Sequence, residues 1–269
     1  MLPIYTELIK SYSEFCKLRS LSSTKYVDLS SGKFFFPTTL LPTYIYSLKN
    51  NKKFIMPKNE SVRNYVELCT GQIAPGDLNN KTYIAIEKLP KFAKDFDTTI
   101  GNINNICTNG DLFGGANSFN YYLSELCDNI YEHADFKDAY VLVQKYEKQG
   151  FVEIVIVDDG CTIPGSFEKK NIEFDEDGQY LIQAVNGLST KKEEGRGKGL
   201  GTSMIIIVEG LRGQIFVASR NAALYKDSNR SIIYKLKKEE IYSGTLITIR
   251  LPYPAKKLSG DEFNEYIEN

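Results

Sequence analysis

Two groups of polar residues in the second half of the chain have the types and spacing that ligand chemistry needs. Asp158 ends an apolar run and precedes Gly160, so its carboxylate would stand at a strand end and present a hydrogen-bond acceptor to a cleft. Asp-Gly pairs are also common in hairpin turns, which is the alternative for this segment. Earlier in the chain, Glu125, Asn129 and His133 recur at every fourth position, which places them on one face of a helix. An ordinary solvated face is the alternative for that polar stripe.

A glycine-rich segment, residues 195–203, leads directly into an apolar run over residues 204–211. Alternate glycines before a helix allow backbone N–H groups to converge on an anion at the helix N-terminus. The spacing of the P-loop nucleotide motif is absent. A flexible linker is the alternative, but a linker rarely runs straight into an apolar helix. The segment therefore favours an anion-binding site.

The elements that must position these residues can be predicted from the pattern of apolar side chains. A helix over residues 117–134 carries the polar stripe on one side and apolar residues on the other. A hairpin follows, with strands over residues 138–146 and 151–157, and its second strand ends at Asp158. The polar helix and the acceptor therefore belong to one α/β unit.

The first half of the chain predicts a smaller α/β unit of its own. Strands are expected over residues 26–29, 53–56 and 83–86. Three helices are expected: one that begins near Leu8 and ends at residues 20–24, a short one over 42–48 with its proline in the first turn, and one over 60–69. We place the domain boundary near residue 100. The chain then divides into an N-terminal α/β domain, residues 1–100, and a second domain, residues 101–269.

Composition excludes several classes of protein. The 269 residues include 33 Lys and Arg against 34 Asp and Glu, which gives no electrostatic reason to expect nucleic acid or an anionic membrane as a partner. A single His excludes a His-rich metal site. Five Cys, odd in number and without a C-x-x-C pair, predict reduced thiols and a cytoplasmic location. Neither a signal peptide nor a membrane-spanning run is expected.

Four motifs in this order resemble the nucleotide-binding motifs of the GHKL superfamily, which includes DNA gyrase B, a heat-shock chaperone, histidine kinases and MutL. Glu125-x-x-x-Asn129-x-x-x-His133 resembles the N box, and Asp158-x-Gly160 resembles the first Gly box. Residues 197–201 resemble the second Gly box, and residues 244–252 are similar to the closing strand that carries the Thr of the family. The resemblance covers residues 115–253 and implies an α/β fold, the two-layer α/β sandwich known as the Bergerat ATP-binding fold.

The resemblance also implies a role for individual residues. Glu125 would orient or deprotonate the attacking water, and Asn129 would be a ligand of Mg²⁺. Asp158 would accept a hydrogen bond from the adenine amino group, supported by Thr245. The implied contacts to ATP are Asp158, Gly160, Arg196, Gly197, Lys198, Gly199, Leu200, Gly201 and Thr245. Residues 166–194 would form a mobile ATP lid, in which residues 189–191 could reach the γ-phosphate when the lid closes. A solvated loop is the equal alternative for residues 189–191.

Two departures from the motifs restrict the function. Thr162 stands where the first Gly box usually has a second glycine, so the hinge there is stiffer or the turn is built differently. The only His of the chain, His133, lies in the N box, so self-phosphorylation on a separate histidine is not expected. An N box that ends in His-Ala resembles the anti-sigma-factor serine kinases, which phosphorylate a partner protein.

The pattern of the N-terminal half faintly resembles a STAS domain, and a packing or dimerisation domain is the preferred alternative. The phosphate acceptors that a STAS-like half would offer are Ser30, Ser31, Thr38 and Thr39. Three functions are then open: an ATPase switch that regulates a partner or a homodimer, a serine/threonine kinase of the anti-sigma type, and a non-catalytic nucleotide sensor. The cofactors that the resemblance implies are ATP and Mg²⁺.

Overall fold

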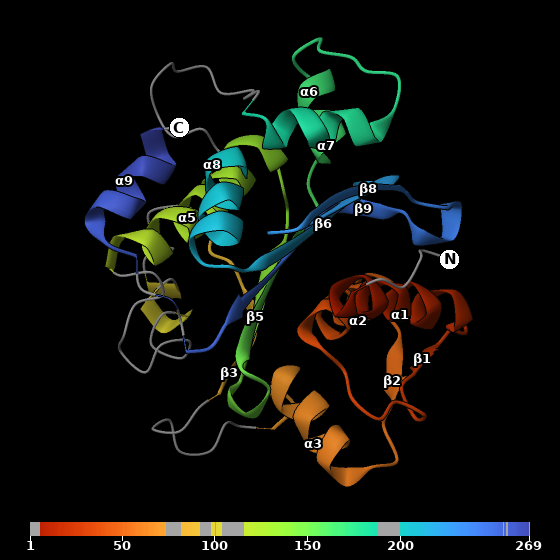
Figure 1. Ribbon diagram of the computed structural model, residues 1–269. Helices are drawn as coiled ribbons and strands as arrows, with labels where there is room; N and C mark the ends of the chain where they lie inside the picture. The colour runs from red at the N-terminus through yellow and green to blue at the C-terminus, as the bar shows by residue number, and fades with distance from the viewer. Residues whose placement is uncertain are drawn as a thin grey trace.

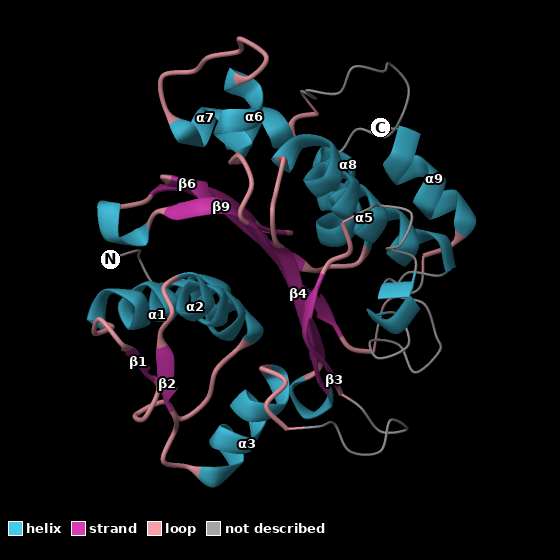
Figure 2. Ribbon diagram, turned by 180° about the vertical axis from the view of Figure 1, so that it is seen from behind, coloured by secondary structure: helices cyan, strands magenta, loops and turns pink. Residues whose placement is uncertain are grey.

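The hairpin predicted around Asp158 forms the centre of a larger sheet in the computed structural model, which describes residues 6–73, 82–91, 98–99, 101–103, 116–187, 200–254, 256 and 258–268. This sheet has seven strands in the order β3-β4-β5-β9-β6-β7-β8, and all neighbouring strands are antiparallel. The strands are β3 (Tyr83–Lys88), β4 (Ala139–Tyr146), β5 (Phe151–Asp158), β6 (Gln214–Arg220), β7 (Ala222–Asp227), β8 (Arg230–Lys235) and β9 (Tyr242–Pro252). The sheet curves between two layers of helices (Figure 2).

Both faces of the sheet are apolar, as the central strand β5 illustrates. Val152, Ile154 and Ile156 point into one hydrophobic core. Val155 and Val157 point into a second core on the opposite face. Because side chains alternate along a strand, a sheet with two apolar faces needs a covering layer on each side.

The first layer comes from the C-terminal part of the chain and covers the face that carries Asp158. It consists of α5 (Ala116–Asn129), the π-helical turn η3 (Ile130–Ala134), α6 (Ile163–Glu168), α7 (Asp177–Val185), α8 (Leu200–Ile205), the π-helical turn η5 (Ile206–Gly210) and α9 (Gly260–Glu268). In Figure 1, α5, α8 and α9 lie together on one side of the sheet and α6 and α7 lie at its upper end. This sheet and its helices form the predicted α/β sandwich, so the fold class is confirmed.

The second layer is the N-terminal part of the chain, which packs on the opposite face. Its helices are α1 (Glu7–Leu21), α2 (Pro37–Lys49) and α3 (Glu60–Cys69), and β1 (Tyr26–Asp28) pairs in parallel with β2 (Lys53–Ile55). Tyr12 and Phe15 of α1 share a core with Phe216 and Tyr242 of the sheet. The smaller N-terminal α/β unit is therefore joined to the sheet by a common core (Figure 1).

The predicted first residue of one helix in this layer is wrong. The helix expected over 42–48 begins at Pro37, and Pro42 lies inside it rather than in its first turn. Pro37 occupies the first helical turn, where its missing N–H costs nothing. Pro42 is buried, and the surrounding core stabilises the helix across the hydrogen bond that this proline cannot make. The predicted helix over 60–69 matches α3 from end to end.

Three strands of the sheet, β6, β7 and β8, lie in a segment for which we made no prediction from the sequence. A turn at residues 227–230 joins β7 to β8, and neither strand shows a strict alternation of apolar and polar residues. Among the described residues, no helix is both long enough and apolar enough to cross a membrane.

Candidate functional site

Asp158 stands at the end of β5 and is the centre of the site. It pairs in register with Thr245 of β9, and both side chains are buried, at 5% and 8% exposure. The Asp158 Oδ1 atom accepts a hydrogen bond from the Gly160 backbone N–H at 2.9 Å. Burial raises the pKa of the Asp158 carboxyl to about 7, against the backbone hydrogen bond from Gly160 that lowers it. A carboxyl in this state can change its charge at neutral pH.

Gly160 brings the acceptor turn against the end of the polar helix. A Cβ atom at this position would lie 2.1 Å from the carbonyl oxygen of Ala134, the last residue of η3. The next residue, Cys161, donates its backbone N–H to that same carbonyl at 2.5 Å. Only glycine allows so close an approach, so the two motifs meet through the backbone. On the other side of Asp158, a Cβ atom at Gly244 would lie 2.1 Å from the Asp158 carbonyl oxygen.

Ser219 of β6 belongs to the site, although the sequence did not single it out. Its Oγ atom donates to the carbonyl oxygen of Gly244 at 3.1 Å and accepts from the N–H of Ile163 at 2.9 Å. It also lies 3.4 Å from the Oγ1 atom of Thr245. Ser219 therefore links the closing strand to the start of α6. No motif marks this residue, because its importance comes from the pairing of β6 with β9.

The polar helix is α5, which continues into the π-helical turn η3. Glu125 and Asn129 lie one turn apart on α5, as predicted. In the part of the chain that the structure describes, the buried Asn129 Nδ2 atom has no hydrogen-bond partner. The amide oxygen of Asn129 is the kind of hard donor that Mg²⁺ takes, so the donor chemistry fits that ion. A π-helical turn at this point is common at functional sites. The side chain of His133 lies outside the described residues.

The second glycine motif is described only at its end. Arg196, Gly197, Lys198 and Gly199 lie outside the described residues. Leu200 begins α8, which packs beside α5. A Cβ atom at Gly201 would lie 2.4 Å from the carbonyl oxygen of Val185 at the end of α7, so this glycine is required by helix packing.

Two hydroxyl groups follow that glycine at the start of α8. The Oγ1 atom of Thr202 and the Oγ atom of Ser203 are buried and have no hydrogen-bond partner among the described residues. Buried hydroxyls are normally paired, so this arrangement is the one expected where a bound ligand completes the hydrogen bonding. We add Thr202 and Ser203 to the candidate site.

Thr162, the residue that departs from the first Gly box, has a local structural role. It is the N-cap residue of α6, and its Oγ1 atom accepts the backbone N–H of Gly165 at 3.1 Å. The backbone at Thr162 is extended, with φ at −64°, so no glycine conformation is needed. A helix therefore begins directly after Thr162.

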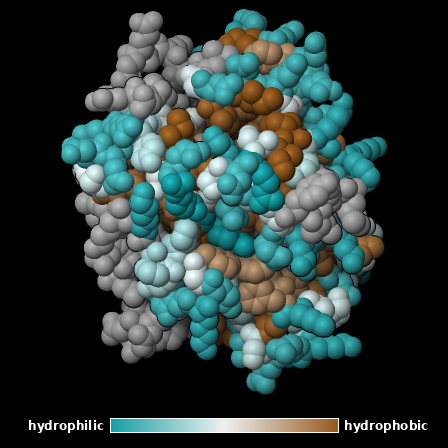
Figure 3. Space-filling view, viewed as in Figure 1, coloured by the Kyte–Doolittle hydropathy of each residue, from teal (hydrophilic) through white to brown (hydrophobic). Residues whose placement is uncertain are grey.

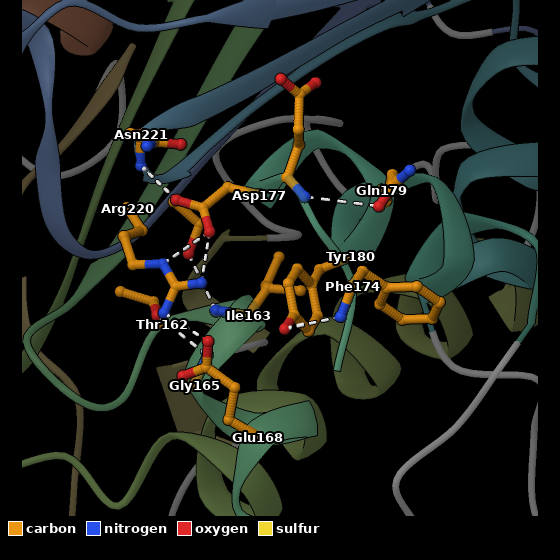
Figure 4. Close-up of polar contacts among 12 residues, drawn as sticks. Thr162, Ile163, Gly165, Glu168, Phe174, Asp177, Gln179, Tyr180, Arg220 and Asn221 are labelled. Atoms are coloured by element: carbon orange, nitrogen blue, oxygen red, sulfur yellow. Dashed lines mark hydrogen bonds and ion pairs between the residues drawn. The ribbon is translucent and has the colours of Figure 1, made fainter. Parts of the chain in front are cut away.

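The segment predicted to be a mobile lid, residues 166–194, contains the end of α6 and all of α7 in its described part. Arg220 donates from Nε to Asp177 Oδ1 at 2.7 Å and from Nη1 to Glu168 Oε1 at 2.7 Å. The backbone N–H of Asn221 donates to the other oxygen of Asp177 at 3.1 Å. These bonds hold α6 and α7 to the turn between β6 and β7 (Figure 4). Glu168 and Asp177 therefore anchor part of the segment predicted to be a lid, and residues 189–191 lie outside the described residues.

The surface of α7 differs from its surroundings. Hydrophobic residues gather over α7 and the adjoining part of the sheet in the space-filling view (Figure 3). Ile182 of α7 is 40% exposed. The helix α7 is thus anchored by Asp177 and exposes an apolar residue on its outer side.

The family model of the histidine kinase-, DNA gyrase B-, and HSP90-like ATPases matches residues 114–255. The matched range begins before α5 and ends after β9, so it contains all four predicted motifs. No curated protein and no solved structure matches the chain. Within the described residues, no group of three or more His, Cys, Asp or Glu side chains could hold a metal ion.

Proposed function

This chain belongs to the family of histidine kinase-, DNA gyrase B-, and HSP90-like ATPases, and on that basis we propose that it is an ATP-driven regulatory switch. In this proposal, binding of Mg-ATP changes the contacts of the chain with a second copy or with a regulatory protein partner, and slow hydrolysis reverses the change. The observation that carries it is the buried pair of Asp158 and Thr245, which presents a polar acceptor at the end of two central strands.

The residues of the site have complementary tasks in this proposal. The Asp158 carboxylate accepts a hydrogen bond from the adenine amino group, and Thr245 supports the contact. Asn129 provides an oxygen ligand for Mg²⁺, and Glu125 orients the attacking water and takes up its proton. When bound, Mg²⁺ neutralises negative charge on the phosphates. Arg196, Gly197, Lys198 and Gly199, with Leu200 and Gly201, are proposed to surround those phosphates.

A serine/threonine kinase of the anti-sigma type is the second candidate, because the N box ends in His133-Ala134. Two of the four proposed acceptors in a STAS-like N-terminal half are unsuited to that role. Thr38 and Thr39 are fully buried, and their hydroxyls are bonded to Glu153 and to the carbonyl of Ser11. The shared core of the N-terminal layer and the sheet supports the packing-domain alternative instead. A nucleotide sensor without catalysis is the third candidate.

Incubation of the purified chain with γ-labelled ATP separates the three candidates. The proposal predicts free labelled phosphate at a rate above the protein-free control. Label transferred to a protein partner would support the kinase, and bound nucleotide with neither product would support the sensor. Mass measurements with and without ATP test whether a dimer forms. A cytoplasmic location is part of the same proposal.

Two variants test the roles of the site residues. Asp158→Asn removes the carboxylate and is expected to weaken ADP binding about 10- to 100-fold, the cost of losing a hydrogen bond to a charged group. Asp261→Asn, an exposed site in the first turn of α9, is the matched control. Unchanged affinity in Asp158→Asn would refute the proposed nucleotide site. Glu125→Gln should retain binding and lose hydrolysis, whereas retained turnover would remove Glu125 from its role.

A further inference from the structure

The helix α2 runs along β5 on the face opposite the nucleotide site and is held at both ends. Near its N-terminus, the backbone N–H of Thr38 donates to Glu153 Oε1 at 3.0 Å. At its last residue, Lys49 forms an ion pair with Asp159, with Nζ 3.0 Å from Oδ2. Glu153 lies near the start of β5 and Asp159 directly follows its end. The N-terminal layer therefore contacts the turn that directly follows the acceptor Asp158.

We propose that Lys49 is a positioning residue for nucleotide binding, which holds the Asp159 turn and through it the ionised Asp158 carboxylate that receives adenine. The inference rests on the proposed function, because it assigns Asp158 to adenine. It gives the N-terminal layer a role in the site without any contact between that layer and the nucleotide.

The contacts of Asp159 explain how one lysine can affect the turn. The Oδ1 atom of Asp159 accepts the backbone N–H groups of Lys137 and Asp138, at 3.0 and 2.9 Å. Its own backbone N–H donates to the carbonyl of Asp138 at 3.1 Å. These bonds tie the exit of β5 to the entry of β4. Lys49 holds the remaining oxygen of the carboxylate, whose side chain is only 13% exposed.

Charge couples the same two residues to the acceptor. The charged and titratable groups that interact with Asp158 include Lys49 from α2, Asp159 and Cys161 from its own turn, and Tyr242 from β9. Burial has the largest effect on the pKa of Asp158. The negative charge of Asp159 also raises this pKa, and the positive charge of Lys49 lowers it. Lys49 thus favours the ionised form that can accept a hydrogen bond from adenine.

The test measures the dissociation constant of Mg-ADP by calorimetry between about pH 5.5 and pH 8.5. Loss of Lys49 in Lys49→Ala is expected to move the midpoint of the binding profile up by less than about one pH unit, which weakens binding at pH 7 by at most about fivefold. Lys49→Arg keeps the charge and should behave like the wild type. Lys17→Ala, at an exposed lysine on α1, makes the same charge change away from the turn and should also leave the profile unchanged.

Asp159→Asn distinguishes a coupled charge from a merely structural contact. Asparagine keeps the oxygen that accepts from Lys137 and Asp138 but removes a negative charge, so the midpoint should move down rather than up. The Lys49–Asp159 pair is partly exposed, with 44% of the lysine side chain accessible, so the thermal midpoint of Lys49→Ala should change by no more than about 2 °C.

The outcomes separate this inference from the proposed function. If the wild type binds Mg-ADP and Lys49→Ala has the same affinity and the same pH profile, the role of Lys49 is refuted and the nucleotide site stands. Movement of the midpoint in the same direction in Lys49→Ala and Asp159→Asn would also refute it. Failure of the wild type to bind any adenine nucleotide would overturn both.

Discussion

One buried carboxylate joins the N-terminal layer to the sheet, and its removal gives the largest stability change that we expect. Glu153 is completely buried in the face of β5 opposite Asp158. Its Oε1 atom accepts from the Thr38 N–H at 3.0 Å and from the Thr38 hydroxyl at 2.6 Å. Its Oε2 atom accepts from Arg250 Nε at 3.1 Å and Nη2 at 2.6 Å. Glu153 also provides the acceptor that α2 lacks at its own N-cap, Phe36.

The variant Glu153→Ala would remove all four hydrogen bonds and leave a nearly buried arginine without its carboxylate. The Arg250 side chain is 11% exposed and lies over the rings of Phe36 and Phe151, with its guanidinium carbon 4.9 and 4.2 Å from their centroids. Removing one partner of a buried ion pair costs about 3–5 kcal/mol, because the remaining charge stays buried. The same amount is a large part of the total stability of an ordinary domain.

Urea unfolding followed by far-ultraviolet circular dichroism and tyrosine fluorescence measures this loss, since the chain has no Trp and 18 Tyr. Hydrogen exchange of peptides from α2 and β5 tests whether both layers are affected together. Lys235→Ala, which removes an exposed pair with Glu176, is the control and should cost less than about 1 kcal/mol. A double variant, Glu153→Leu with Arg250→Met, should recover part of the loss of Glu153→Leu alone.

The reasoning fails if Glu153→Ala lowers the free energy of unfolding by less than about 1 kcal/mol. Increased exchange in α2 with wild-type protection of β5 would also contradict it, because the N-terminal layer and the sheet would then unfold independently. That second result would favour a separable N-terminal unit that ends before β3, since β3 pairs with β4 in the large sheet.

Three further predictions concern the turn after β5. The pKa of Asp158 is about 7 in the fold and therefore above its usual 3.8, so this group stabilises the fold most below about pH 4. Its contribution to the free energy of unfolding, about 4 kcal/mol, is lost as the pH rises from about 4 through 7. Asp158→Asn should abolish this pH dependence when the free energy of unfolding is measured from about pH 4 to 8. Gly160→Ala brings a Cβ atom against the Ala134 carbonyl, so it should lower the free energy of unfolding by about 1–3 kcal/mol and abolish ADP binding. Gly260→Ala, whose Cβ atom would meet nothing within 4 Å, should change neither. Thr162→Ala should lower stability by about 1 kcal/mol and Thr162→Gly by only a few tenths; equal losses in thermal unfolding would contradict the capping role.

The local pattern of the sequence was sufficient for most elements near the site. The polar stripe on α5 and the hairpin of β4 and β5 follow from helical spacing and period-two alternation, which are properties of neighbouring residues. The last strand, β9, was expected from the family resemblance alone. The strands β6, β7 and β8 were missed, and Ser219 was missed with them. Its role depends on a partner strand far along the chain, which no local pattern specifies.

The sequence by itself determined the family and the identity of the residues that carry its motifs, because spacing along one helix or one strand end is fixed by local geometry. Only the tertiary structure decided the environment of those residues. The pKa of Asp158 depends on burial by distant segments, and the requirement for Gly160 depends on the approach of Ala134. The contact of Lys49 with Asp159 arises because α2 packs along the far side of β5, and such packing joins residues that the sequence keeps apart.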